Sequence, residues 1–240
     1  IMNDLLKMSK GNKKLKKTLI FDLPAGKTCP MAHECKSYVV MNDNGKTSIK
    51  DGDNNKFRCY AASQENQYTN VFNARKYNFD LITKTLNSEN GFYKTYELIN
   101  KSIQEHKTRN INKVRIHSSG DFFNGEYLRA WLAVARLNPL MQFYCYSKSL
   151  HLFGSNVSIP DNFFLTASFG GKRDDLIHKR YFKRWAIVVN SEDEAIKKGI
   201  EHIGKPYKID KDDSSCFKPD PFALLIHGTQ KKGYFKNLKK

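Results

Sequence analysis

Apolar residues recur along the first half of the chain with two different spacings, and these spacings predict particular elements. The run TLIFDL (18–23) reads as a buried strand that the turn sequence PAGKT closes. Beyond residue 63, apolar positions lie three and four apart, which indicates two helices over 70–86 and 91–107. Asn44-Gly45 separates two short β-prone runs, so residues 39–58 are predicted to form an inserted hairpin ribbon.

The second half alternates strand patterns with helix patterns. The predicted strands cover 112–121, 141–147, 161–171, 185–190 and 222–228, and the predicted helices cover 124–139, 174–184 and 191–204. This βαβ rhythm predicts a mainly parallel sheet with helices outside it. With about six strands in all, an open, partial (β/α) barrel fits better than a closed one of eight strands. We therefore expect a single α/β domain over residues 1–240, with basic tails at both ends.

The composition of the chain indicates the cellular compartment and the kind of partner to expect. Hydrophobic residues make up 40% of the chain, and no apolar run approaches the length of a membrane span. The first residues lack the apolar stretch of a secretory signal, so we expect a reducing cytoplasm and no disulfides. A formal charge of +17 favours a polyanionic partner, and nucleic acid, either DNA or RNA, is the expected one. The alternative is a Lys- and Asn-rich composition that reflects a low-GC genome and binds nothing.

The five cysteines fall into two groups. Cys145 lies inside an apolar strand, where a thiol usually serves packing. Cys29, Cys35, Cys59 and Cys216 lie in predicted loops, and soft thiolate ligands select zinc or an iron-sulfur cluster. Five residues separate Cys29 from Cys35 and twenty-three separate Cys35 from Cys59, which does not match the paired spacing of zinc ribbons. Spacing therefore favours a cluster over zinc, with scattered free thiols as a third reading.

Several short motifs carry a resemblance to known families. SKGNKKL, LPAGKTCPMAHEC, CYA, SGDFFN and YSKS together resemble the phage family called gene product 88 over most of the chain. More distantly, the chain is similar to radical S-adenosylmethionine (SAM) enzymes, which have a three-cysteine loop after the first strand and a Gly-acid turn after a later one. The gaps between the cysteines are longer here than in the usual Cys-x3-Cys-x2-Cys pattern.

The distant resemblance implies a cofactor site. Cys29, Cys35 and Cys59 would hold a [4Fe-4S] cluster whose fourth iron binds SAM, and the turn of Ser118, Ser119, Gly120 and Asp121 would accept the SAM amino group. If Cys216 is a fourth ligand, no iron remains for SAM and the cluster is structural or redox-active. Zinc stays open as the alternative metal.

Other candidate residues lie at strand ends and in a basic stretch. His117, Asp121 and Lys148 follow predicted strands, where α/β sheets place catalytic groups, although Asp121 is equally suited to cap the next helix. Basic side chains of the stretch 172–184 are predicted to contact nucleic-acid phosphates: Lys172, Arg173, Lys179, Arg180, Lys183 and Arg184. The interleaved aromatic residues are expected to bury a helix face.

The sequence thus predicts an iron-sulfur protein that resembles radical SAM enzymes and acts on or binds nucleic acid in the cytoplasm of a host cell. The alternative is a nucleic-acid-binding protein or nuclease in which four cysteines hold a structural iron-sulfur or zinc site. P-loop, dinucleotide-binding glycine and HExxH motifs are all absent from the sequence.

Overall fold

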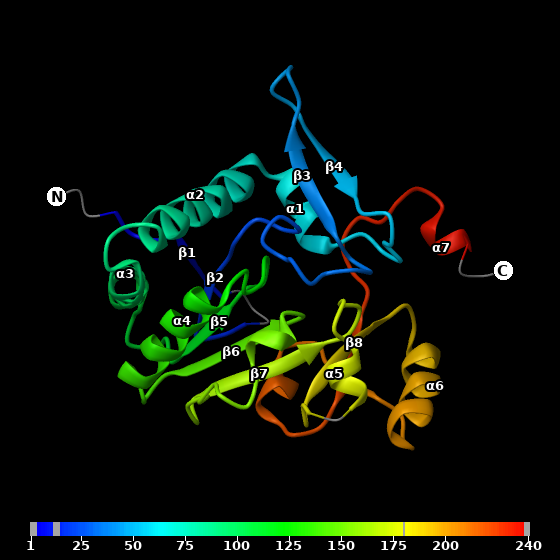
Figure 1. Ribbon diagram of the computed structural model, residues 1–240. Coiled ribbons are helices and arrows are strands. Elements are labelled where there is room, and N and C mark those ends of the chain that lie inside the picture. Colours follow the sequence, from blue (N-terminus) through cyan, green and yellow to red (C-terminus); the bar gives the residue numbers. More distant parts are fainter. Residues whose placement is uncertain (1–3, 12–14, 180, 238–240) are drawn as a thin grey trace.

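A computed structural model describes residues 4–11, 15–179 and 181–237 (Figure 1). At its centre is a mostly parallel sheet with the order β1-β2-β5-β6-β7-β8-β10-β9. All neighbouring pairs from β2 to β9 are parallel, and only β1 runs antiparallel to β2. The strands are β1 (Met8–Lys10), β2 (Thr18–Phe21), β5 (Lys113–Ile116), β6 (Gln142–Ser147), β7 (Phe163–Ser168), β8 (Trp185–Val189), β9 (Lys208–Ile209) and β10 (Phe222–Leu225).

The helices connect these strands. They are α1 (Tyr60–Gln67), α2 (Thr69–Leu86), α3 (Gly91–His106), α4 (Gly125–Leu137), α5 (Asp175–His178), α6 (Glu192–Ile203) and α7 (Tyr234–Asn237), with short 3-10 turns η1 (Leu150–Leu152) and η2 (Ser214–Phe217). The predicted α/β class with a mainly parallel sheet is confirmed. The predicted radical-SAM-like partial barrel of about six strands is not confirmed, because eight of the described strands form one sheet, from β1 to β9 in the order above, in which no barrel is detected.

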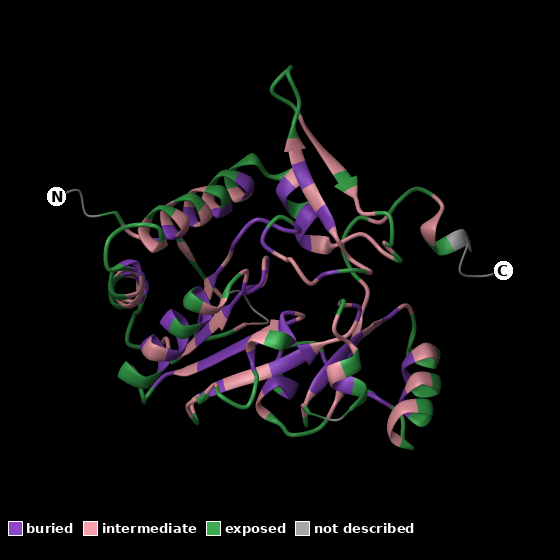
Figure 2. Ribbon diagram, viewed as in Figure 1, coloured by how far each residue is buried: buried purple, intermediate pink, exposed green. Residues whose placement is uncertain are grey.

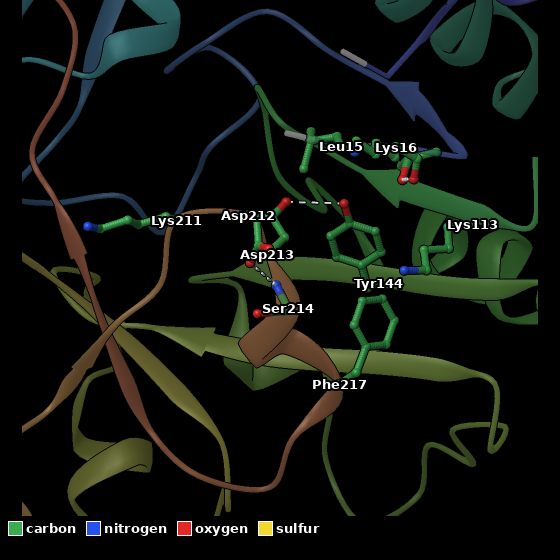
Figure 3. A pocket seen from close by; sticks show the side chains of 10 residues that line it. Leu15, Lys16, Lys113, Tyr144, Lys211, Asp212, Asp213, Ser214 and Phe217 are labelled. Carbon is green, nitrogen blue, oxygen red and sulfur yellow. Dashed lines mark hydrogen bonds between the residues drawn. The ribbon is translucent and has the colours of Figure 1, made fainter. Parts of the chain in front are cut away.

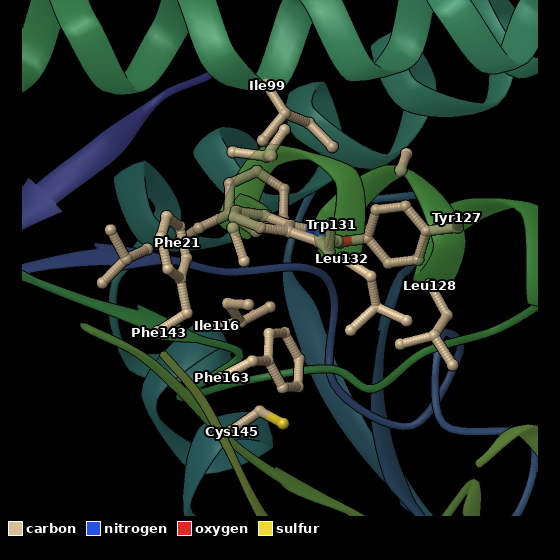
Figure 4. Close-up of a cluster of buried hydrophobic side chains, with 14 of the residues drawn as sticks. Phe21, Ile99, Ile116, Tyr127, Leu128, Trp131, Leu132, Phe143, Cys145 and Phe163 are labelled. Carbon is tan, nitrogen blue, oxygen red and sulfur yellow. The ribbon is translucent and has the colours of Figure 1, made fainter. Parts of the chain in front are cut away.

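The helices that follow the strands cover one face of the sheet. Because side chains alternate along a strand, Phe143 and Cys145 point to that face and join the large core under α4, where Tyr127 and Trp131 are fully buried (Figure 4). Tyr144 points to the second face, where it packs with Cys216 of η2. Figure 2 shows the buried residues concentrated along the strands between these two layers. The first face of the sheet is therefore buried, whereas the second face is buried around Tyr144 and Ala186 and only partly covered at Arg115 and Phe164.

The hairpin of β3 (Ser37–Met41) and β4 (Thr47–Asp51) projects from the body of the molecule (Figure 1). Gly45 has a φ of +75°, which the turn at its tip needs and which glycine adopts without strain. The Asn44-Gly45 signal therefore identified a real hairpin, although it spans 37–51 rather than the expected 39–58. One side of the ribbon packs against α1, where Ile49 contacts Ala61 and Ala62.

Two helical predictions differ from the structure. The region 63–107 holds three helices instead of two, because α1 precedes the two expected ones. The basic helix expected over 174–184 is only the four-residue α5. Beyond it the chain leads into β8, with Phe182 and Trp185 packed into the core and the Arg184 guanidinium group donating to the carbonyl oxygens of Leu165 and Lys218. Within residues 4–11, 15–179 and 181–237, no helix is long and apolar enough to cross a membrane.

Candidate functional site

The carboxyl ends of the parallel strands meet at one edge of the sheet, and the loops there are tied together. Leu23 N donates to Ser119 O at 3.0 Å, which joins the loop after β2 to the loop after β5. His33 N and Glu34 N both donate to Gly170 O, and Lys172 N donates to Met31 O at 2.8 Å. Loops at this edge are where open α/β sheets usually bind ligands.

Three of the cysteines lie at the carboxyl edge. Cys29 and Cys35 belong to the loop after β2, and Cys59 immediately precedes α1. Ser37 links the last two, because its N donates to Cys35 O at 2.8 Å and its Oγ accepts from Cys59 N at 3.2 Å. All three thiols are half-buried, and none forms a disulfide.

The thiols of this edge are held in their protonated form. Burial raises the pKa of Cys29 well above its ordinary value, and the charges of Asp121, Cys59 and Cys35 raise it further. Burial likewise raises the pKa of Cys59 to about 12. For Cys35, burial outweighs the nearby Lys148 ammonium group, which lowers the pKa. Thiolate is the nucleophilic form of cysteine, so this arrangement does not favour thiol nucleophiles at neutral pH.

The predicted iron-sulfur function is wrong for this structure. The thiols lie close enough to affect one another's pKa, yet no group of three or more His, Cys, Asp or Glu side chains among the described residues could hold a metal ion. This finding also removes the alternative function, a nucleic-acid-binding protein or nuclease built around a four-cysteine iron-sulfur or zinc site. Binding of SAM near the turn 118–121 stays a prediction.

The predicted fourth ligand, Cys216, lies elsewhere in the fold. It is fully buried on the second face of the sheet, packed with Tyr144 and Phe222. Burial raises its pKa to about 12, and Asp213 raises it as well. The loop containing Cys216 therefore folds inward as η2 and brings this cysteine to an apolar cluster. Cys145 is also fully buried, in the core under α4.

Asp22 and the two serines of the turn belong to a network of buried polar groups. The Ser118 hydroxyl donates to both Asp22 carboxylate oxygens, at 2.7 and 2.8 Å, and Ser119 Oγ donates to Glu65 Oε1 at 3.2 Å. Arg75 bridges the two carboxylates, with its guanidinium 3.1 Å from Asp22 and 3.0 Å from Glu65. The two serines predicted to bind a cofactor thus make bonds within the protein. The network fixes α1 and α2 against the carboxyl edge.

The glycine of the turn is required by close packing. Gly120 has a φ of +91°, and a Cβ at this position would lie 2.7 Å from Leu23 Cβ and 2.7 Å from Thr28 Oγ1. A side chain here would push the cysteine-bearing loop away from the strand end. This turn therefore positions the loop.

Asp121 joins the ends of β5 and β6. One of its carboxylate oxygens accepts from Phe122 N and from Ser147 Oγ, each at 2.7 Å, and the other accepts from Lys148 N at 2.8 Å. Burial raises the pKa of this carboxyl group, and these hydrogen bonds counteract the rise. Predicted as catalytic and cofactor-binding, Asp121 is placed by the structure as a tie between strand ends.

His117, also predicted as catalytic, lies inside the core. Its Nε2 is 2.8 Å from the Tyr127 hydroxyl, and its ring packs edge-on against Phe122. Its φ is +67°, and burial lowers its pKa to about 3, so the imidazole is neutral. The structure does not bring His117 to the cysteines.

Lys148, the third residue predicted as catalytic, does lie at the carboxyl edge. Its Nζ donates to Ser168 Oγ at 2.7 Å and to the carbonyl oxygen of Phe169. Both acceptors are neutral. Among the described residues, no carboxylate forms an ion pair with this ammonium group. Lys148 is therefore a cation held in a fixed position without a carboxylate partner.

The arginines of the basic stretch are engaged within the protein. Arg173 pairs with Asp175 at 2.9 Å, and Arg184 donates to backbone carbonyl groups. Arg180 lies outside the described residues. These two described arginines are thus less available for phosphates than the sequence predicted.

The lysines of the stretch remain available. Lys172, Lys179 and Lys183 are exposed in the segments that flank α5, and Tyr181, in the same stretch of the chain, is 69% exposed. We call Lys172, Lys179, Tyr181 and Lys183 the basic patch. Phe182 and Trp185 pack into the core, as expected for the aromatic residues, whereas Tyr181 does not.

A separate cavity lies at the other end of the strands, on the second face. It has a volume of about 530 Å³, and Lys16, Lys113, Tyr144 and Phe217 contribute to its lining (Figure 3). Asp213 at its base accepts from Arg115 at 2.6 Å and from the Tyr144 hydroxyl at 3.1 Å. No sequence motif pointed to this cavity, because its residues come from four separate segments.

The sequence patterns also did not indicate Arg75 and Glu65, the buried charged residues of the network. Arg75 and Glu65 are charged residues in helical segments, a pattern that ordinarily indicates a solvated surface. Only their pairing across α1 and α2 explains their burial, and the sequence carries no local signal of that pairing.

Comparison with known proteins places the chain in a family without assigning an activity. The model of the family described as Gene product 88 matches residues 3–240. No curated protein and no solved structure matches the chain, so the radical SAM resemblance has no support there. The resemblance based on the motifs around Cys29 and Gly120 is confirmed by the family match over nearly the whole length. The chain belongs to the gene product 88 family.

Proposed function

We propose that this protein binds single-stranded nucleic acid on the basic patch, without a metal centre. The observation that carries the proposal is the combination, around one short helix, of three exposed lysines with an exposed tyrosine. Lysines neutralise phosphates, and an aromatic face stacks on an unpaired base.

The charged side chains in and around the basic patch support the proposal. Within the part of the chain that the structure describes, no ion pair involves Lys172, Lys179 or Lys183. The neighbouring carboxylates are engaged: Asp175 pairs with Arg173, and Asp174 accepts from Gly170 N and Gly171 N. The lysines therefore keep their positive charge available for phosphates, in a chain whose formal charge is +17.

The position of Tyr181 supports a single strand as the ligand. The next residue, Phe182, packs into the core, and Trp185 donates its indole N–H to the Tyr207 hydroxyl at 3.0 Å. The chain that follows Tyr181 is thus packed into the core, while the ring of Tyr181 itself stays exposed. In a duplex the bases are already stacked on one another, whereas a single strand offers free base faces to such a ring.

The proposal is tested by fluorescence anisotropy with a labelled oligothymidylate. Replacing Lys172, Lys179 and Lys183 with Gln removes three phosphate contacts and is expected to weaken binding by about tenfold or more at low salt. The matched control replaces Lys84, Lys94 and Lys107, which are exposed at the far side of α2 and α3. Equal weakening by both triple variants would show that only the overall charge matters and would contradict a localised site.

A further inference from the structure

We infer that the strand bound on the basic patch continues across the carboxyl edge of the sheet, where Lys148 binds one of its phosphates beside Cys35. This inference rests on the proposed function and names the second part of its binding surface. Lys148 here is a binding residue, and no covalent step at the cysteines is involved.

The basic patch and the cysteine loop are joined by one turn. Lys172, the first residue of the patch, donates its backbone N–H to Met31 O at 2.8 Å, and Ala32 forms a β-bridge with Gly171. Gly171 also lies against Lys148, because a Cβ placed on Gly171 would be 3.1 Å from Lys148 Cβ. A nucleic-acid strand that contacts Lys172 can therefore reach Lys148 across a single turn of the protein surface.

Lys148 is suited to hold a phosphate. Its two acceptors, Ser168 Oγ and Phe169 O, fix the ammonium group without neutralising it. The carboxylates nearby have other partners, since Glu34 pairs with Lys56 and Asp174 accepts from two backbone N–H groups. An anion arriving at this edge would thus meet a positioned cation.

Asp121 limits where that anion can lie. Its carboxylate is fully buried and is surrounded by Phe122 N, Ser147 Oγ and Lys148 N. The backbone of Lys148 contacts this carboxylate while the ammonium group is directed to the end of β7. A phosphate is therefore expected on the β7 side of Lys148, at Ser168 and away from the carboxylates that lie beside the Gly170–Gly171 turn.

Cys35 provides a reporter at this position. It is half-buried, and the Lys148 ammonium group lies close enough to lower its pKa, although burial raises that pKa more. The fully buried Cys145 and Cys216 serve as internal controls, because a strand on the surface leaves their reaction with reagents unchanged.

The test measures alkylation of each cysteine by iodoacetamide, at mildly alkaline pH and low salt, with and without oligothymidylate. The modified peptides are quantified by mass spectrometry, and anisotropy on the same samples establishes that the oligonucleotide is bound. At ten times the Kd, a covered thiol is expected to react about tenfold more slowly. In Lys148→Gln the ratio of rates with and without oligonucleotide should approach one for Cys35, although saturating oligonucleotide still occupies the basic patch.

The outcomes separate this inference from the proposed function. Slower alkylation of Cys35 in the wild type, lost in Lys148→Gln, supports both. Binding by anisotropy with an unchanged Cys35 rate overturns the path across the carboxyl edge and leaves the basic patch standing. Absence of binding at low salt overturns the proposed function, and this inference with it. The wild-type comparison is decisive even if Lys148→Gln fails to fold.

Discussion

At the scale of single residues, the carboxyl edge depends on buried charges that stabilise the loops around the cysteines. Arg75 is only 4% exposed and pairs with both Asp22 and Glu65. Burial raises the pKa of Glu65, while the charge of Arg75 lowers it. Removing one member of such a group leaves an uncompensated buried charge, which costs more than the pair contributes.

We therefore predict that Arg75→Met lowers the free energy of unfolding by about 3 to 5 kcal/mol. Urea denaturation followed by circular dichroism measures this change. The matched control is Arg129→Met, because Arg129 is 62% exposed and pairs with Glu126 on the surface of α4. For this control we expect a loss below about 1 kcal/mol. Equal losses in the two variants would contradict the structural role of the network.

A second residue-scale prediction concerns pH. Burial lowers the pKa of His117 to about 3, below its ordinary value of 6.5, so the unfolded state binds more protons between these values. The neutral imidazole therefore contributes stability that is present above pH 6.5 and is lost as the pH falls toward 3. Between pH 7.5 and pH 5 this loss amounts to about 2 kcal/mol.

The variant His117→Asn removes this group and tolerates the positive φ of the position. We expect the wild type to lose about 2 kcal/mol more than His117→Asn between pH 7.5 and pH 5 in urea denaturation. The exposed His151 provides the control variant His151→Asn. If His117→Asn keeps the wild-type pH dependence, His117 is not neutral in the folded protein.

At the scale of elements, the strands and long helices followed from the sequence, and the short elements did not. The apolar period predicted α2, α3, α4 and α6 to within a few residues, and α6 lies between its N-cap Ser191 and its C-cap Gly204. The basic helix failed because alternating charged and aromatic residues fit a helical period equally well in a loop. In the structure Phe182 and Trp185 pack into the core, whereas Tyr181 stays exposed.

The exposure of Tyr181 gives an element-scale prediction. Tyr181→Ala should weaken binding to oligothymidylate by about 5- to 150-fold, since stacking on one base is worth about 1 to 3 kcal/mol. Binding to a duplex of the same length should change much less. Tyr93→Ala is the matched control, because Tyr93 is 65% exposed on α3. If single strand and duplex lose affinity equally, Tyr181 does not act by stacking.

At the scale of the whole molecule, the parallel sheet explains both what the sequence predicted and where it misled. Loops after successive parallel strands meet at one edge, so the approximate gathering of Cys29, Cys35 and Lys148 follows from topology alone. A metal site needs several side chains that are directed at one point. Their directions depend on how the loops pack, and the spacing of the cysteines in the sequence does not determine that packing. Cys216 illustrates this, because its loop folds onto the second face instead of joining the carboxyl edge.

The net charge is also a property of the whole molecule. It indicates a polyanionic partner, and only the basic patch indicates where on the surface that partner binds. Replacing three lysines with Gln lowers the formal charge from +17 to +14 in both triple variants described above. Any difference between the two variants therefore reports where the lysines lie rather than how many there are.

The most direct test of the account is the dependence of oligothymidylate affinity on salt concentration, measured for the wild type and both triple variants. We predict that the slope of log affinity against log salt becomes shallower by about 2 in the variant of Lys172, Lys179 and Lys183, because each phosphate contact on a single strand contributes about 0.7. The variant of Lys84, Lys94 and Lys107 should keep the wild-type slope. Identical slopes in all three proteins, or a wild-type affinity that salt does not change, would contradict nucleic-acid binding at the basic patch.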